Sequence, residues 1–255
     1  QLDIRLQLTK SSTAFHVLSG LSNPPSSTSI TFNSCKLFLK RVFPSESLSR
    51  ELAMTQEDLA YDMRSTRVTQ DRISAGALGA DIVGVLSGFK PETVSVMFIR
   101  SAAVNGSWVE SPYSTIDFLN TSNPGAMVNS IYVTWGSQQI PLRPVTSNST
   151  NDKAVAYANY VSIYEKGDAD IFSKEALPML SYSQFQARPI YCFDLRQDAL
   201  NPSHDSRTIE QERGSLTVHA TFDTALPTTT SVIICGVGRS ELSIGKDGRV
   251  EKTGF

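Results

Sequence analysis

Histidines are the first side chains to consider for metal or acid–base chemistry. The chain has three, His16, His204 and His219, and none stands in H-x-x-x-H, H-E-x-x-H or H-x-H spacing. A metal site built mainly on imidazoles is therefore not expected, and the missing histidine cluster argues against a cupin-like enzyme. The members of a Ser-His-Asp triad can come from anywhere in a chain, but the G-x-S-x-G turn of one large hydrolase class is absent. We interpret His219 as a structural residue in a half-buried strand.

The cysteines also lack the spacing of a reactive or metal site. Cys35, Cys192 and Cys235 are odd in number, far apart and without C-x-x-C spacing. Because unpaired cysteine is among the most buried residue types, we expect buried free thiols.

Two further motifs resemble ligand sites only in part. Gly236-Val237-Gly238 begins like a dinucleotide fingerprint, but Glu241 stands where the third glycine is needed and no β-α-β unit follows. Asp168 and Asp170 fall in an expected loop, but the ligand order of a calcium-binding EF-hand is missing. No cofactor and no catalytic residue is predicted.

Three Asn-x-Ser/Thr triplets match the N-glycosylation acceptor, at Asn105, Asn120 and Asn148. All three fall in segments that we expect to be loops. The first twenty residues carry charges where a signal peptide needs an apolar run, so we interpret the triplets as chance matches in Ser/Thr-rich loops.

Composition indicates a folded chain without a strong electrostatic partner. Of 255 residues, 40% are hydrophobic and 19% charged, and 23 basic against 25 acidic side chains give a net charge of −2. This balance argues against a nucleic-acid or membrane binder that works by charge. No apolar run reaches the roughly 18 residues of a membrane span. The chain begins with Gln1 rather than Met, from which we expect a processed product or a piece of a longer polypeptide.

Period-two alternation of apolar residues predicts a mainly β fold of the sandwich or barrel kind. The clearest N-terminal strands are Leu2–Leu8 and Cys35–Phe43, which suggest an antiparallel pair. The expected strands that follow are 63–73, 82–86, 93–99, the hairpin 131–135 with 139–142, and three closing strands within 189–195, 215–222 and 230–237. Near-continuous apolarity in Val232–Val237 predicts burial on both faces.

Two segments depart from this alternation. Ser45 can cap a short helix or linker within 45–62, and apolar residues at three- and four-residue steps predict one helical insertion between Asp152 and Leu180.

Short motifs in the last third carry a resemblance to a known family. They are Tyr191–Leu195, Arg213–Val218, Phe222–Pro227 and Ser231–Ile234, and Leu2–Leu6, Lys36–Val42, Val104–Ser107 and Ser111–Tyr113 precede them in the same order. In this pattern the chain resembles the C-terminal portion of the double jelly-roll major capsid proteins of the Polinton/Maverick, adintovirus and adenovirus-like lineage.

The resemblance implies an antiparallel jelly-roll β-sandwich, the second half of a double jelly roll. Residues 1–50 would be a strand pair that completes a preceding jelly roll, 51–62 a linker or short helix, and 63–255 the complete C-terminal jelly roll. The first jelly roll would be mostly absent. An orphan strand pair exposes edges and an apolar face, so we expect Leu2–Leu8 and Lys36–Val42 to pack in a sheet whose other strands lie outside this chain.

The implied function is that of a non-enzymatic capsid subunit. Three copies would form a pseudo-hexameric capsomer of an icosahedral shell, assembled in the host cytoplasm or nucleus. Its partners would be neighbouring capsomers, an N-terminal jelly-roll portion or chain, and minor capsid or penton proteins, with no membrane span and no specific nucleic acid.

Interfaces would then do the work, and the loops 100–130 and 143–188 would meet neighbours. Trp108 and Tyr113 are the candidate interface residues, because Trp and Tyr are enriched at interfaces. The alternative is a jelly-roll carbohydrate-binding module whose ligand stacks on Trp135 and Tyr132.

Overall fold

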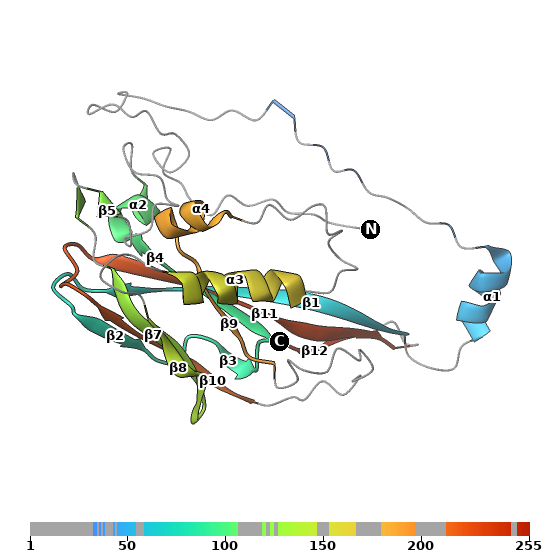
Figure 1. Ribbon diagram of the computed structural model, residues 1–255. Coiled ribbons are helices and arrows are strands. Elements are labelled where there is room, and N and C mark those ends of the chain that lie inside the picture. Colours follow the sequence, from blue (N-terminus) through green and yellow to red (C-terminus); the bar gives the residue numbers. More distant parts are fainter. Residues whose placement is uncertain are drawn as a thin grey trace.

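A computed structural model describes residues 33–34, 36, 38, 43, 45–54, 59–106, 119–120, 123–124, 127–146, 153–166, 180–196, 213–245 and 249–255. From Leu59 onward these residues build two packed antiparallel sheets (Figure 1).

Helix α1 (Glu46–Met54) precedes the sandwich and is drawn apart from it in Figure 1. Ser45 caps it, because its hydroxyl accepts a hydrogen bond from the Leu48 N–H at 3.3 Å. This confirms the predicted short helix. In the expected strand 35–43, Lys36, Phe38 and Phe43 are described; all three are exposed and outside regular secondary structure. The pairing of this segment and the division of the chain into domains stay predictions.

The first sheet has the order β1-β11-β4-β9. Its strands are β1 (Leu59–Ile73), β11 (Thr230–Ile244), β4 (Thr93–Arg100) and β9 (Tyr191–Asp194). A fifth strand, β12 (Val250–Gly254), pairs with β11 beyond the end of β4, so β4 and β12 follow one another along the same edge of β11. Strand β1 occupies the opposite edge of β11 along its whole length.

The second sheet has the order β2-β10-β7-β8. Its strands are β2 (Gly79–Ile82), β10 (Arg213–Phe222), β7 (Val128–Trp135) and β8 (Gln138–Thr146). The short β3 (Ser87–Phe89) also pairs with β10, at the other end from β2. β2 and β3 therefore follow one another along β10 and together form one interrupted strand.

The pairing scheme is that of a jelly roll. β1 pairs with β11, β2 and β3 with β10, β4 with β9, and β7 with β8, all antiparallel. A long antiparallel ribbon folded across two sheets gives these pairs, and this is the eight-stranded jelly-roll arrangement. The predicted jelly-roll sandwich is confirmed.

The core lies between the sheets and follows from strict alternation. In β4, Val94, Val96 and Phe98 are almost fully buried, whereas Ser95 and Met97 between them are only half-buried. Phe98 meets Phe222 of the second sheet edge-to-face, with ring centroids 5.6 Å apart. Each such buried side chain contributes about 1.5–3 kcal/mol to the stability of the sandwich.

The helices close the side of the sandwich at the β8 and β9 edges. α3 (Ala154–Lys166) packs against both strands, and α4 (Tyr182–Ala187) packs on α3 through Tyr157 and Phe185, whose ring centroids are 5.3 Å apart. Ser181 and Gln184 form a capping box at the start of α4. The predicted helical insertion is confirmed over 154–166. The loops also carry α2 (Ser101–Asn105), β5 (Leu119–Asn120) and β6 (Asn123–Pro124).

Two strand predictions are corrected. The segment 82–86 is not a strand, because β2 ends at Ile82 and the chain turns at Gly84, whose φ is +71°. Among the described residues, four strands rather than three close the fold, because β12 follows β11. Its residues 250–253 are all exposed and show no apolar alternation, so pattern reasoning could not detect it.

Candidate interaction surfaces

The two residues predicted from sequence as interface anchors, Trp108 and Tyr113, lie outside the described residues. Asp168, Asp170 and Cys35 lie outside them too. The described surfaces are the outward faces of the two sheets and the end of the sandwich at β12.

The outward face of the second sheet is polar and internally hydrogen-bonded. Asp81, His219 and Tyr132 stand directly opposite one another on β2, β10 and β7. His219 Nδ1 lies 2.7 Å from the Asp81 carboxylate and Nε2 3.2 Å from the Thr134 hydroxyl. Tyr132 stacks on the imidazole with centroids 4.5 Å apart. Both ring nitrogens have partners within the fold, as expected of a structural histidine.

The stacking residues of the carbohydrate-binding alternative are not presented together. Trp135 is 1% exposed and packs inward against Gly214, where an added Cβ would lie 2.9 Å from the indole. The prediction that Trp135 stacks on a carbohydrate is wrong. Side chains alternate along β7, so the Trp135 side chain lies in the core while Tyr132 lies on the outer face. One ring of the expected pair is therefore inaccessible.

The outward face of the first sheet has the opposite character. One row of directly opposed residues, Val68, Cys235, Ser95 and Cys192, crosses all four strands. Val68 on the edge strand is 62% exposed, and the central positions are half-buried. The same face also carries Ile233, Val237, Thr93 and Met97, and Thr66 and Gln70 flank Val68 on β1. We call this set the outer apolar face.

Helix α2 covers one end of this face. Ile99, Ala103 and Val104 form a small buried cluster there, against which Met97 and Ile233 pack. The prediction of two-sided burial for Val232–Val237 therefore holds fully on the inner side and partly on the outer side. A sheet face in contact with water normally carries polar residues, so this face is the better candidate for an interface.

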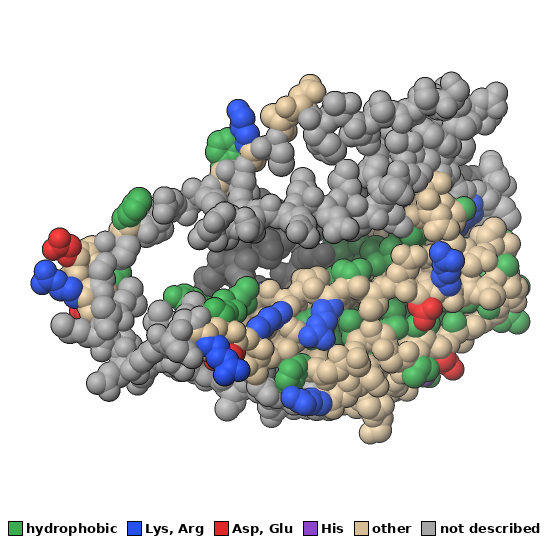
Figure 2. Space-filling view, turned by 180° about the vertical axis from the view of Figure 1, so that it is seen from behind, with side chains coloured by type: hydrophobic (Ala, Val, Ile, Leu, Met, Phe, Trp, Pro, Cys, Tyr) green, Lys and Arg blue, Asp and Glu red, His purple; other side chains and the backbone are tan. Residues whose placement is uncertain are grey.

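Charged pairs border the outer apolar face. Arg239 Nε lies 2.7 Å from Glu92 Oε1, and Arg196 donates two hydrogen bonds to the Asp194 carboxylate at 2.9 and 2.8 Å. Figure 2 likewise shows hydrophobic side chains beside Lys and Arg side chains on the visible face. An apolar centre with a polar rim is the usual anatomy of a protein interface.

The two described cysteines are free thiols, as predicted. Cys192 is 3% exposed, and desolvation by burial raises the pKa of its thiol to about 11. The Ser95 hydroxyl, 3.5 Å from Cys192 Sγ, opposes this rise. Burial also raises the pKa of the Cys235 thiol, which is half-buried on the outer apolar face. Neither has the lowered pKa of a catalytic thiolate.

The glycine motif of residues 236–238 has a packing role. Gly236 and Gly238 lie on the inner side of β11, where an added Cβ would stand 2.9 and 2.6 Å from atoms of Phe255. The two glycines thus make room for an aromatic ring at the end of the sandwich. Sequence reasoning missed this role, because the ring comes from a segment that pattern analysis left unassigned.

Of the acceptor triplets, Asn105 ends α2 and Asn120 lies in β5, so neither stands in an irregular loop as expected. Asn148 lies outside the described residues. The Asn105 side chain is close to Arg72, with Nη2 and Oδ1 3.5 Å apart.

Within the described parts of the chain, no three His, Cys, Asp or Glu side chains come together in a way that could hold a metal ion. The helices described include none with the length and apolarity of a membrane-crossing helix.

Comparison with known proteins gives matches in structure only. No protein-family model matches the chain, and no curated protein matches it in sequence. A structure of PBCV-1 VP54, fitted into a reconstruction of the virophage Sputnik, covers 84% of this chain at 12% identity and a TM-score of 0.45. The mavirus major capsid protein covers 80% at 10% identity and a TM-score of 0.40.

A structure of the Sputnik virophage itself covers 77% of the chain at 15% identity and a TM-score of 0.37. The chain spans 55% of the VP54 chain and 42% of the mavirus chain. These three solved structures are of viral capsids or capsid proteins.

Proposed function

We propose that this chain is a non-enzymatic structural subunit of a viral capsid, whose work is to bury its outer apolar face against neighbouring subunits. The observation that carries the proposal is the contrast between the two sheets. The second sheet presents His219, Tyr132 and Thr134 in satisfied polar contacts, whereas the first presents Val68, Cys235 and Val237.

A rigid sandwich with one apolar outward face suits assembly. Two packed sheets hold the face in one shape, and loops at the ends are free to vary. The rim carboxylates Glu92 and Asp194 are already engaged by Arg239 and Arg196. The face therefore calls for an apolar partner surface rather than one of opposite charge.

The finer assembly is part of the same proposal. Three copies form a pseudo-hexameric capsomer of an icosahedral shell, with an N-terminal jelly-roll portion or chain, neighbouring capsomers and minor capsid or penton proteins as partners. The chain then resides in the virion capsid after assembly in the host cytoplasm or nucleus. Closed rotational symmetry is the usual outcome when one subunit uses the same contact repeatedly.

Negative-stain electron microscopy of the purified chain, with and without an N-terminal jelly-roll portion or chain, tests this function. We expect threefold particles or shells when both parts are present. Particles without rotational symmetry, together with binding on a glycan array, would instead support the carbohydrate-binding alternative.

A further inference from the structure

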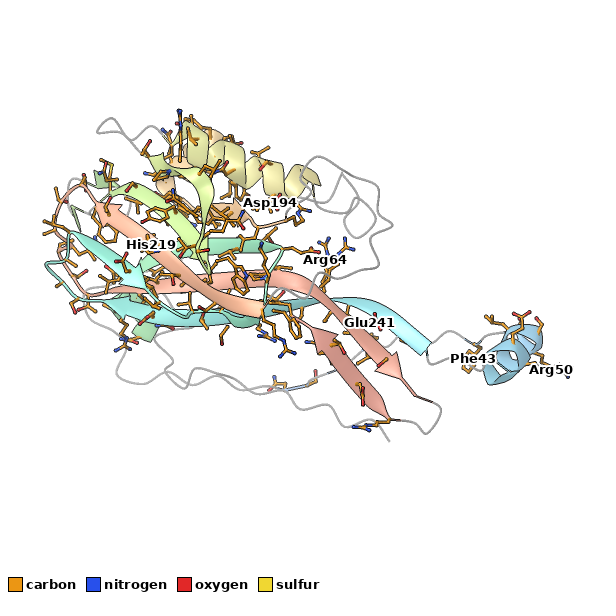
Figure 3. All side chains as sticks on the ribbon, turned by 90° about the horizontal axis from the view of Figure 1, so that it is seen from below. Phe43, Arg50, Arg64, Asp194, His219 and Glu241 are labelled. Carbon is orange, nitrogen blue, oxygen red and sulfur yellow. The ribbon has the colours of Figure 1, made fainter. Side chains whose placement is uncertain are left out.

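The end of the sandwich beyond β4 carries a three-stranded extension. It consists of 59–65 of β1, 238–244 of β11, and β12, and we call it the tongue. Figure 3 shows these strands running past the others, with Glu241 on the extension. On its inner side Tyr61, Met63 and Val250 are 49%, 44% and 57% exposed. These apolar side chains continue the core face where the second sheet no longer covers it.

A preformed seat for an aromatic ring lies at the base of the tongue. Phe255 fills it and is 1% exposed. Gly236 and Gly238 form the floor of the seat. The Leu86 and Pro91 side chains lie next to Gly236, beside the ring. The Arg67 guanidinium stands 4.7 Å from the ring centroid, and its Nη1 donates to the Ser87 carbonyl at 3.3 Å. Every wall of the seat belongs to an element other than the segment that carries Phe255.

That segment, the arm (250–255), is held by few contacts. In the described structure β12 pairs only with β11, and its first four residues are exposed. Lys252 Nζ reaches the Ser65 hydroxyl at 2.8 Å, and the Phe255 N–H donates to the Arg239 carbonyl at 3.0 Å. Gly254, at φ +104°, bends the chain so that the ring enters the seat. Phe255 is therefore the one large buried side chain of an arm that is otherwise held by strand pairing with β11.

We propose that the arm is exchangeable: in the assembled protein, β12 and Phe255 of one copy occupy the β11 edge and the seat of a neighbouring copy. This inference rests on the proposed assembly function. A second copy is the occupant that fits, because its arm has the same register along β11 and the same ring for the glycine floor. Exchange of identical elements is a low-cost route to association.

A cross-link between two different copies tests the exchange. The pairs 239 with 255 and 245 with 249 are hydrogen-bonded, so Leu242 and Lys252 form a non-hydrogen-bonded pair. The Cα atoms of such a pair are about 4.5 Å apart, which a disulfide can span. One chain carries Leu242→Cys and the other Lys252→Cys, both in a background of Cys35→Ser, Cys192→Ala and Cys235→Ser.

After mixing, assembly and oxidation, we expect a disulfide-linked dimer of the two different chains in the assembled fraction. A chain carrying both substitutions controls for geometry, since dilute unassembled protein should close the bond internally. Assembled particles without the mixed dimer would overturn arm exchange while leaving the proposed function intact. Protein that never assembles would contradict the proposed function itself.

The internally closed double variant gives a second readout that does not depend on mixing. Locking the arm in place should reduce the assembled fraction at least tenfold, and a reducing agent should restore it. Equal assembly of the locked and reduced forms would refute the exchange. A thermal melt of both forms verifies that each is folded.

Discussion

At the residue scale, Gly238 and Phe255 form the most closely fitted contact at the end of the sandwich. A Cβ at position 238 would lie 2.6 Å from the Phe255 Cβ, closer than packed atoms allow. Gly238→Ala should therefore lower the free energy of unfolding by about 1–3 kcal/mol, and Phe255→Ala by about 3–5 kcal/mol. Urea unfolding of both variants measures these losses.

The double variant is the control for this contact. If the added methyl group acts by displacing Phe255, Gly238→Ala should cost much less in a Phe255→Gly background, which lacks the Cβ as well as the ring, than in the wild type. Additive losses would mean that the two positions do not act on one another.

Cys192 gives a pH prediction at the same scale. Its thiol pKa rises from 9.0 to about 11 on burial, so the unfolded chain loses this proton at lower pH than the folded chain does. The stability associated with Cys192 is complete below pH 9 and is lost as the pH rises toward 11. The loss amounts to roughly 2–3 kcal/mol.

Cys192→Ala isolates this effect, because every other titrating group is common to both proteins. Urea unfolding from pH 8 upward measures the free energy of unfolding of both proteins. As the pH rises, the wild type should lose that amount of free energy relative to the variant. A difference that stays constant with pH would contradict the buried thiol.

Single residues were predictable where one local rule decides. The absence of metal-ligand spacing predicted a structural role for His219. The usual burial of free thiols predicted that Cys192 is buried. Trp135 was misassigned, because its inward direction depends on which face of β7 meets the core. The roles of Gly236 and Gly238 depend on Phe255, which no local pattern connects with them.

At the element scale, the start of α4 offers a clear test of local design. The Ser181 hydroxyl accepts from the Gln184 N–H, and the Gln184 side chain accepts from the Ser181 N–H at 2.9 Å. Ser181→Ala should cost about 1 kcal/mol of stability in urea unfolding, because it leaves a helix N–H without its cap. Ser181→Asp, which keeps an acceptor oxygen at the cap position, is the matched control and should cost less than about 0.5 kcal/mol. Equal losses in the two variants would contradict the capping role.

Strands were predictable where apolar residues alternate clearly or β-branched residues concentrate, as in 93–99, 131–135 and 215–222. The helical insertion at 154–166 was also predictable. The segment 82–86 was not, because its apolar residues Ile82 and Leu86 enter the core from either side of a turn rather than from one strand. Strand β12 forms because it pairs with β11. This tertiary interaction leaves no periodic pattern of apolar residues in the sequence, so it could not be predicted.

At the scale of the whole molecule, the sandwich is asymmetric. Its second sheet has a satisfied polar exterior, and its first sheet carries the outer apolar face and an edge strand, β1, whose second edge pairs with no strand in the described structure. Sequence motifs predicted the class of fold, but not which face is apolar. That distinction depends on the register between strands, which places Val68, Cys235 and Ser95 in one row.

The most direct test of the account is the molar mass of the assembled protein, measured by light scattering for wild type, Val68→Asp and Leu142→Asp. Both positions are exposed apolar residues on edge strands, at 62% and 91%, but only Val68 lies on the outer apolar face. Each substitution should cost the isolated subunit no more than about 1 kcal/mol. We expect wild type and Leu142→Asp to form the same multimer and Val68→Asp to remain a monomer. Equal molar masses for the two variants would contradict assembly through the outer apolar face.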